Sequence, residues 1–176
     1  MIETPGQTIG PFFGFALPFA GDSQLVSPGQ PGAVQFSGLV LDGDGVAVPD
    51  ALIEIWQPDP DGRVVARTGS LRRDGFTFTG WGRAATDNSG RYSFSTLRPG
   101  GEAPFIAVTL FARGLLHRLF TRAYLPGYPP DRLLSALPED RRRTLIARDE
   151  GSTLIFDIKL QGADETVFLG FDSSSD

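Results

Sequence analysis

Residues 153–160 read Thr-Leu-Ile-Phe-Asp-Ile-Lys-Leu, and this stretch carries the clearest structural signal in the chain. Every second residue from Leu154 to Leu160 is apolar, whereas Asp157 and Lys159 lie between them on the other side. In an extended chain, successive side chains point to opposite faces, so this alternation gives one apolar and one polar face. The stretch therefore predicts a half-buried β-strand.

Similar short runs, separated by turn sequences, fill most of the remaining chain. The 22 glycines and 14 prolines are spread along it, which indicates many turns rather than one linker. Asp-Gly-Asp-Gly at 42–45 and Asp-Pro-Asp-Gly at 59–62 are turn sequences of this kind. Short helical turns are expected at 131–137 and 138–143, opened by an Asp cap and an early Pro. Further strands are expected over residues 33–40, 51–57, 91–97, 105–113, 116–125 and 166–171. This spacing predicts an all-β fold, an antiparallel β-sandwich.

The first 32 residues differ from the rest. Pro5 and Pro11 prevent a helix over residues 4–15, yet the segment has too many phenylalanines for a solvated tail. We expect an extended N-terminal arm and lead-in over 1–32 that packs on a partner chain, with packing on the chain's own body as the alternative. A β-sandwich over 33–172 and a frayed Ser-rich tail over 173–176 complete the expected organisation.

Composition restricts the classes of function. A formal charge of −5 over 176 residues disfavours a nucleic-acid or anionic-membrane surface. Cysteine is absent, which excludes disulfides and thiolate metal sites. No apolar run approaches the roughly 20 residues of a membrane span, and the N-terminus lacks a signal core. The default expectation is a cytoplasmic location.

Known catalytic motifs are missing from the residues themselves. The Asp/Gly turns do not complete a calcium loop, and no nucleophile elbow or phosphate-binding glycine loop is present. His117 is the single histidine and lies beside Leu115 and Leu116, which is more typical of a structural or surface histidine than of a ligand. One histidine cannot form a site of two histidines and a carboxylate. Residue chemistry alone indicates an all-β domain with an aromatic arm and no evident catalytic machinery.

A set of local motifs spans nearly the whole chain in order: 4–12 (TPGQTIGPF), 38–42 (GLVLD), 53–57 (IEIWQ), 82–87 (GRAATD), 97–100 (LRPG), 110–114 (LFARG), 142–147 (RRTLIA), 156–158 (FDI) and 162–168 (GADETVF). Each motif alone is weak, but the ordered set resembles the intradiol ring-cleavage dioxygenases. The resemblance is greatest to the α chains of those members that act on protocatechuate.

That family holds a ferric ion with two Tyr and two His, the His forming an A-H-I-H-F type strand. The corresponding strand here is Pro-Phe-Ile-Ala-Val at 104–108, so Phe105 and Ala107 stand where the imidazoles would be. They share one strand face, and neither can donate a lone pair to iron. Tyr is also missing between Gly62 and Gly82 and from the shortened stretch after Gly100. The resemblance implies a metal-free subunit whose partner, the family's β chain, holds the non-haem Fe(III).

The resemblance further implies an active-site cleft between α and β, in a higher oligomer of αβ units. Thr8, Gly10 and Pro11 of the arm, together with Arg113, match residues that line this cleft. A guanidinium suits the ring carboxylate of protocatechuate, although a structural ion pair is the alternative role for Arg113. The implied reaction adds O2 between the phenolic carbons to give 3-carboxy-cis,cis-muconate, in aromatic catabolism by the β-ketoadipate pathway. This chain would orient substrate, exclude water and support assembly, without catalytic residues of its own.

Two other functions stay open at this point. One is a stand-alone, prealbumin-like β-sandwich that binds a ligand and has no enzymatic role. The other is an isolated dioxygenase with an unfamiliar metal site, which a single histidine makes hard to build.

Overall fold

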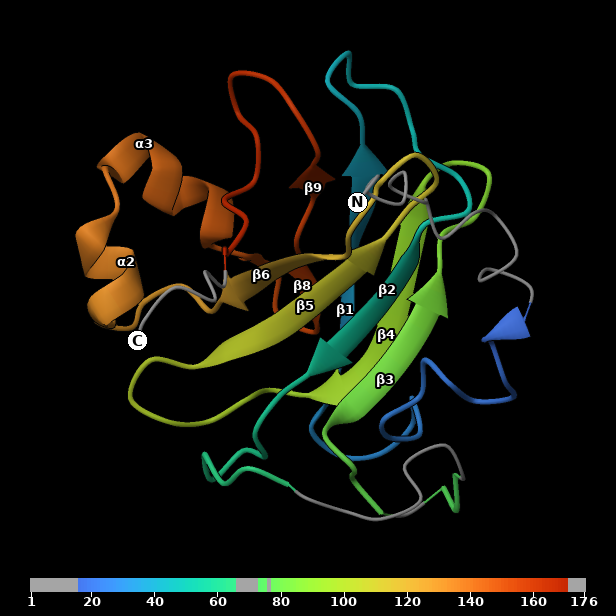
Figure 1. Ribbon diagram of the computed structural model, residues 1–176. Helices are drawn as coiled ribbons and strands as arrows, with labels where there is room; N and C mark the ends of the chain where they lie inside the picture. Colours follow the sequence, from blue (N-terminus) through green and yellow to red (C-terminus); the bar gives the residue numbers. More distant parts are fainter. Residues whose placement is uncertain (1–15, 66–72, 76, 171–176) are drawn as a thin grey trace, which may run out of the picture.

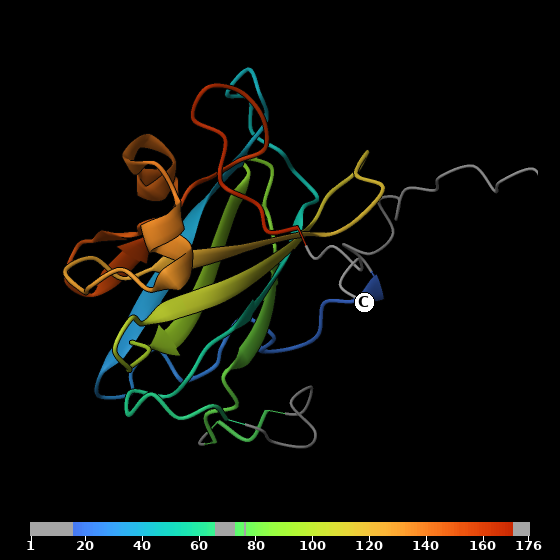
Figure 2. The same cartoon turned by 60° about the vertical axis from the view of Figure 1, so that its left-hand side comes forward.

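The computed structural model describes residues 16–65, 73–75 and 77–170. Two β-sheets are stacked face to face, and a small helical segment (orange) lies at one edge of the stack (Figures 1 and 2). The all-β sandwich predicted from the sequence is confirmed.

The first sheet is built around β1 (Ala33–Leu41). Antiparallel β4 (Arg91–Leu97) flanks it on one side, while β8 (Thr153–Ile155) and β9 (Ile158–Lys159) run parallel to it on the other. β7 (Arg148–Asp149) adds to β8. The sheet is therefore mixed rather than purely antiparallel.

The opening stretch, expected as one strand, is divided between β8 and β9. Between the two strands the Asp157 carboxylate accepts the backbone N–H of Leu39 at 2.9 Å. The predicted alternation nevertheless holds, because Leu154, Phe156 and Ile158 are all buried. The side-chain pattern thus survives where the ladder is interrupted.

The second sheet lies in front in Figure 1 and has the order β3–β2–β5–β6, all antiparallel. Its strands are β2 (Leu52–Trp56), β3 (Trp81–Ala85), β5 (Phe105–Phe111) and β6 (Leu119–Tyr124). β5 and β6 are shorter than expected, since residues 112–118 form the connection between them.

The core fills the space between the two sheets. Phe36, Tyr92, Phe94 and Phe156 pack there as a cluster of aromatic rings with centroids about 6 Å apart. The Tyr92 hydroxyl donates to the carbonyl of Phe156 at 2.5 Å, which satisfies its buried polar group. Burial raises the pKa of Tyr92 well above its usual value.

Part of the lead-in packs on the chain's own sandwich. Leu25 and Val26 are buried, and their backbone N–H groups donate to the carbonyl of Ser95 in β4. A side chain at Gly82 would meet Leu25, with a Cβ only 2.4 Å from its Cδ1, so glycine is needed for this close approach. Residues 1–15, the arm proper, lie outside the described residues, and its packing on a partner stays a prediction.

The expected helical turns are present as α2 (Arg132–Ala136) and α3 (Glu139–Arg142), followed by a 3₁₀ turn, η1 (Arg143–Leu145). Asp131 caps α2 by accepting the N–H of Leu134 at 2.9 Å, as predicted. The strand expected from 166 is wrong: residues 166–170 are irregular and held by bonds to Lys159 and Phe120. Among the described residues, no helix is long and apolar enough to cross a membrane.

Candidate functional site

The outer face of the second sheet carries two of the positions singled out from the sequence, Phe105 and Ala107. In β5, Ile106, Val108 and Leu110 point into the core and are buried. Phe105 and Ala107 therefore lie on the opposite, outward face, as expected for two residues in the place of paired ligands. Their shared face is confirmed.

Phe105 belongs to a second apolar cluster, under the helical segment. Its ring lies 5.3 Å from that of Tyr124, and the pair packs with Leu134 of α2 and Leu145 of η1. Instead of presenting a ligand atom, this position helps to attach the helical segment to β5 and β6.

Ala107 lies in a shallow hollow of about 190 Å³ on the same face. Trp56, its cross-strand neighbour in β2, borders the hollow with a side chain that is 41% exposed. Thr109 and Glu54 complete the lining with Trp81 and Ile55. A small side chain at 107 leaves open the space that an imidazole would take.

These residues do not fit an iron ion. Phe105 and Ala107 have no lone pair to donate, and the part of the chain that the structure describes holds no group of three or more His, Cys, Asp or Glu suited to a metal. Leu71, near one expected tyrosine position, lies outside the described residues. No catalytic step can be assigned to a metal held by the described residues.

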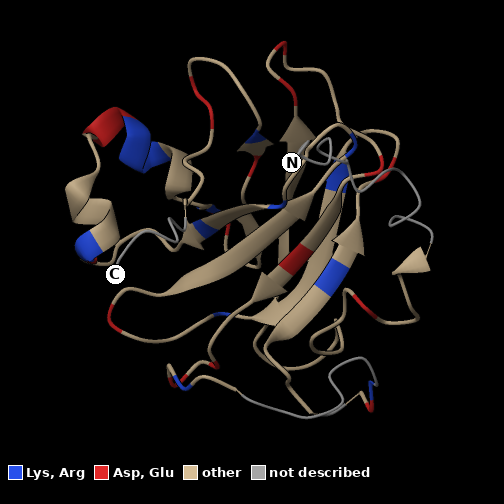
Figure 3. Ribbon diagram, viewed as in Figure 1, with Lys and Arg blue, Asp and Glu red and all other residues tan. Residues whose placement is uncertain are grey.

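Next to the hollow lies an ion pair that sequence reasoning missed. Arg83 of β3 donates from Nε and Nη2 to Oε1 of Glu54 in β2, at 2.9 and 2.5 Å. Figure 3 shows these oppositely charged bands side by side in the two strands. Arg83 also stacks on Trp81 and donates to the carbonyl of Leu17 at 2.8 Å. Through the bond to Leu17, the Glu54–Arg83 pair fixes the lead-in against the outer face. In the sequence, the only signal of this pair is that the two residues carry opposite charges.

Arg113 lies just beyond the far end of β5, in a turn with Gly114. Its side chain is 59% exposed, and Nη2 lies 2.5 Å from Oδ2 of Asp50. Asp50 precedes β2 and has a positive φ of 65°, a backbone conformation that non-glycine residues rarely adopt. Arg113 thus has an acidic partner within the chain, and its Nε and Nη1 donate to none of the other described residues.

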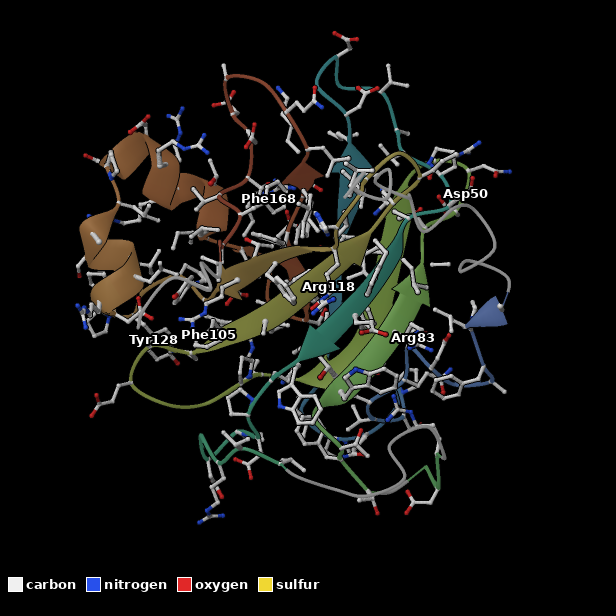
Figure 4. All side chains as sticks on the ribbon, in the orientation of Figure 1. Asp50, Arg83, Phe105, Arg118, Tyr128 and Phe168 are labelled. Atoms are coloured by element: carbon white, nitrogen blue, oxygen red, sulfur yellow. The ribbon has the colours of Figure 1, made fainter. Side chains whose placement is uncertain are left out.

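Arg113 is far from Phe105 and Ala107. Phe105 begins β5 and Phe111 ends it, so about 20 Å of strand separates them. Figure 4 shows Phe105 and Asp50 at opposite ends of the sheet. Arg113 therefore cannot serve a site built on Phe105 and Ala107. Thr8, Gly10 and Pro11 lie outside the described residues, so their expected place in a cleft with Arg113 stays a prediction.

His117 lies exposed in the connection between β5 and β6. This position agrees with a surface histidine, the reading favoured from its neighbours in sequence.

The comparisons with known proteins agree with this fold. A family model described as "Dioxygenase" matches residues 9–105. The protocatechuate 3,4-dioxygenase alpha chain of Burkholderia cepacia is 35% identical over 190 residues, which cover 95% of this chain and 96% of that one. The alpha chain of Pseudomonas putida is 34% identical and covers 96% of both. The beta chain from B. cepacia is 36% identical over 74% of this chain and 65% of its own length.

Among solved structures, the dioxygenase domain of a carbohydrate-binding fusion protein from Streptomyces sp. SirexAA-E superposes with a TM-score of 0.59 at 26% identity, covering 91% of this chain and 99% of that domain. Catechol 1,2-dioxygenase of Acinetobacter sp. ADP1, 19% identical with a TM-score of 0.55 over 77% of this chain and 55% of its own, shares the fold. The sandwich, the family model and the full-length similarity agree: the chain belongs to the intradiol ring-cleavage dioxygenase family.

Proposed function

We propose that this chain is the non-iron-binding α subunit of a protocatechuate 3,4-dioxygenase. With an iron-carrying β chain it forms the cleft in which O2 cleaves protocatechuate to 3-carboxy-cis,cis-muconate. One observation carries the proposal: the chain is 35% identical to an alpha chain over 95% of its length, and the strand that the family resemblance matches to the paired imidazoles has Phe105 and Ala107 instead. These side chains cannot bind a metal, so the reaction needs a second chain.

The beta chain of B. cepacia is itself a relative of this chain, which supports a pair of subunits with a common fold. The β chain would hold the non-haem Fe(III) with all four of its ligands. When bound there, the ferric ion supplies activation of the catecholate toward O2. Several αβ pairs would form the complete enzyme, and a cytoplasmic location stays a prediction.

The share of this chain would be to bind and orient the substrate. Arg113 is exposed, and two of its nitrogens have no partner among the described residues, so it can donate to a substrate carboxylate while it stays bonded to Asp50. A guanidinium can hold two acceptors at once because its donors form a planar fork. Thr8, Gly10 and Pro11 of the arm would line the same cleft. Closing it around the substrate would exclude water and restrict the ring to a productive orientation.

Co-expression with the β chain tests this function. The two chains should purify together as a coloured ferric complex that consumes O2 and protocatechuate in equal amounts. The isolated chain should do neither. A stable monomer that does not bind the β chain would favour the prealbumin-like binding module instead.

A further inference from the structure

We propose that the Arg122 guanidinium replaces the metal ion in this chain, and that this built-in cation keeps iron away from the vestigial site. The inference rests on the family resemblance that matches Phe105 and Ala107 to the paired imidazoles, but not on the identity of the substrate.

The strand register places Arg122 at the two vestigial ligand positions. In the β5–β6 ladder, Ala107 is directly opposite Arg122, and Phe105 is opposite Tyr124. Directly opposite residues have Cβ atoms about 5 Å apart on the same face. Arg122 thus lies on the outward face, next to the space where two imidazoles from β5 would meet a metal.

Its contacts hold the charge at that place. The guanidinium carbon lies 4.2 Å from the centroid of the Phe105 ring, within the range of a cation–π contact. Nη1 donates to the hydroxyl of Tyr124 at 3.0 Å and to Oδ2 of Asp131 at 3.3 Å. Phe105, the residue that replaces one ligand, is therefore the surface on which the cation rests (Figure 4 labels Phe105).

Oxygen donors that could serve a metal are occupied by the same cluster. Tyr124 donates its hydroxyl proton to Oδ2 of Asp131 at 2.8 Å, and the other oxygen of Asp131 caps α2. Burial, which outweighs the nearby Arg122, raises the pKa of Tyr124 to about 12, so the phenol keeps its proton. Phenolate and carboxylate are the forms that bind a hard cation. The cluster offers neither in a free state.

The functional consequence concerns which chain is metallated. Two related chains on one scaffold would compete for the same iron if both kept a partial ligand set. A guanidinium cannot lose its proton under physiological conditions, so its charge repels a metal cation at any working pH. Loss of the imidazoles and gain of this cation together would leave the iron to the partner.

Restoring the imidazoles tests the proposal in the isolated full-length chain. The double variant Phe105→His/Ala107→His should bind Co(II) weakly. Adding Arg122→Gln should tighten binding by roughly tenfold or more, because a unit charge about 5 Å away is removed. Adding Arg122→Lys, which keeps the charge, should leave binding weak. Adding Arg118→Gln is the matched control, since Arg118, in the connection before β6, stacks on Phe120 of that strand at 5.0 Å. Equilibrium dialysis gives the affinities and circular dichroism checks the fold.

Equal Co(II) affinity with and without Arg122→Gln would overturn the proposal, as would failure of every folded variant to bind. If Phe105→His disrupts the apolar cluster, Ala107→His alone suffices. Its imidazole should titrate at a lower pH, followed by NMR, beside Arg122 than in the Arg122→Gln background. Asp131 and the Glu54–Arg83 pair also face this position, and both backgrounds contain them. An unchanged titration would show that no effective positive charge acts there.

Discussion

Removing Arg113 in the assembled αβ enzyme separates its two candidate roles. The Asp50–Arg113 pair is exposed, with side chains 34% and 59% accessible, and pairs of this kind contribute at most about 1 kcal/mol to stability. A charge-assisted hydrogen bond to a substrate carboxylate in a partly dry cleft contributes roughly 1.5–3 kcal/mol. Arg113→Ala should therefore reduce kcat/KM for protocatechuate by roughly one to two orders of magnitude, with little loss of stability.

Steady-state kinetics with two substrates decide between these roles. Catechol lacks the ring carboxylate, so its slow turnover should hardly change in Arg113→Ala, and iron content should stay the same. Arg113→Lys should recover part of the activity, because it keeps the charge without the planar fork. Asp50→Asn is the matched control: Asn tolerates a positive φ as well as Asp does, and it frees the guanidinium without removing it. Equal loss of activity toward both substrates would show that Arg113 supports the structure rather than binding substrate.

Three further predictions concern the arm, the lead-in and the helical segment. Deleting residues 1–15, which lie outside the described residues, should weaken αβ assembly, since each large apolar side chain left in water costs roughly 1.5–3 kcal/mol; unchanged assembly by analytical ultracentrifugation would refute this. Gly82→Val should destabilise the fold by roughly 1–3 kcal/mol through its clash with Leu25, whereas Gly29→Ala, with open space around it, should be neutral in urea unfolding. Because the pKa of Tyr124 is raised to about 12 in the fold, the neutral phenol contributes stability that is fully present below pH 10 and is lost as the pH rises toward 12. Tyr124→Phe should therefore remove a phenolate step near pH 12 from the absorbance titration. A missing step near pH 10 instead would contradict the buried environment.

The sequence predicted those parts of the fold in which local chemistry decides. β4 has the predicted bounds because Asp87 accepts the N–H groups of Ser89 and Arg91 and so ends the turn before it. The cap at Asp131 is equally local. β3 was missed because Trp-Gly-Arg-Ala-Ala shows no apolar alternation, and the need for glycine at 82 comes mainly from Leu25, which is distant in sequence.

For the site, sequence alone placed Phe105 and Ala107 on one face, since strand periodicity determines that. The partners of the charged residues depend on strand register instead. Asp50 is 63 residues from Arg113, and no local pattern connects them. Arg122 could have been found only by pairing 107 with 122 across the connection at 112–118. The sequence predicted a shorter connection, because it extended the strands on both sides into these residues.

The metal content of the purified αβ pair tests the central proposal most directly. Because this chain offers no imidazole at Phe105 or Ala107, the pair should contain one ferric ion, and the isolated chain should contain none and cleave no protocatechuate. Two iron ions per pair, or one tightly bound iron with ring-cleaving activity in the isolated chain, would contradict it.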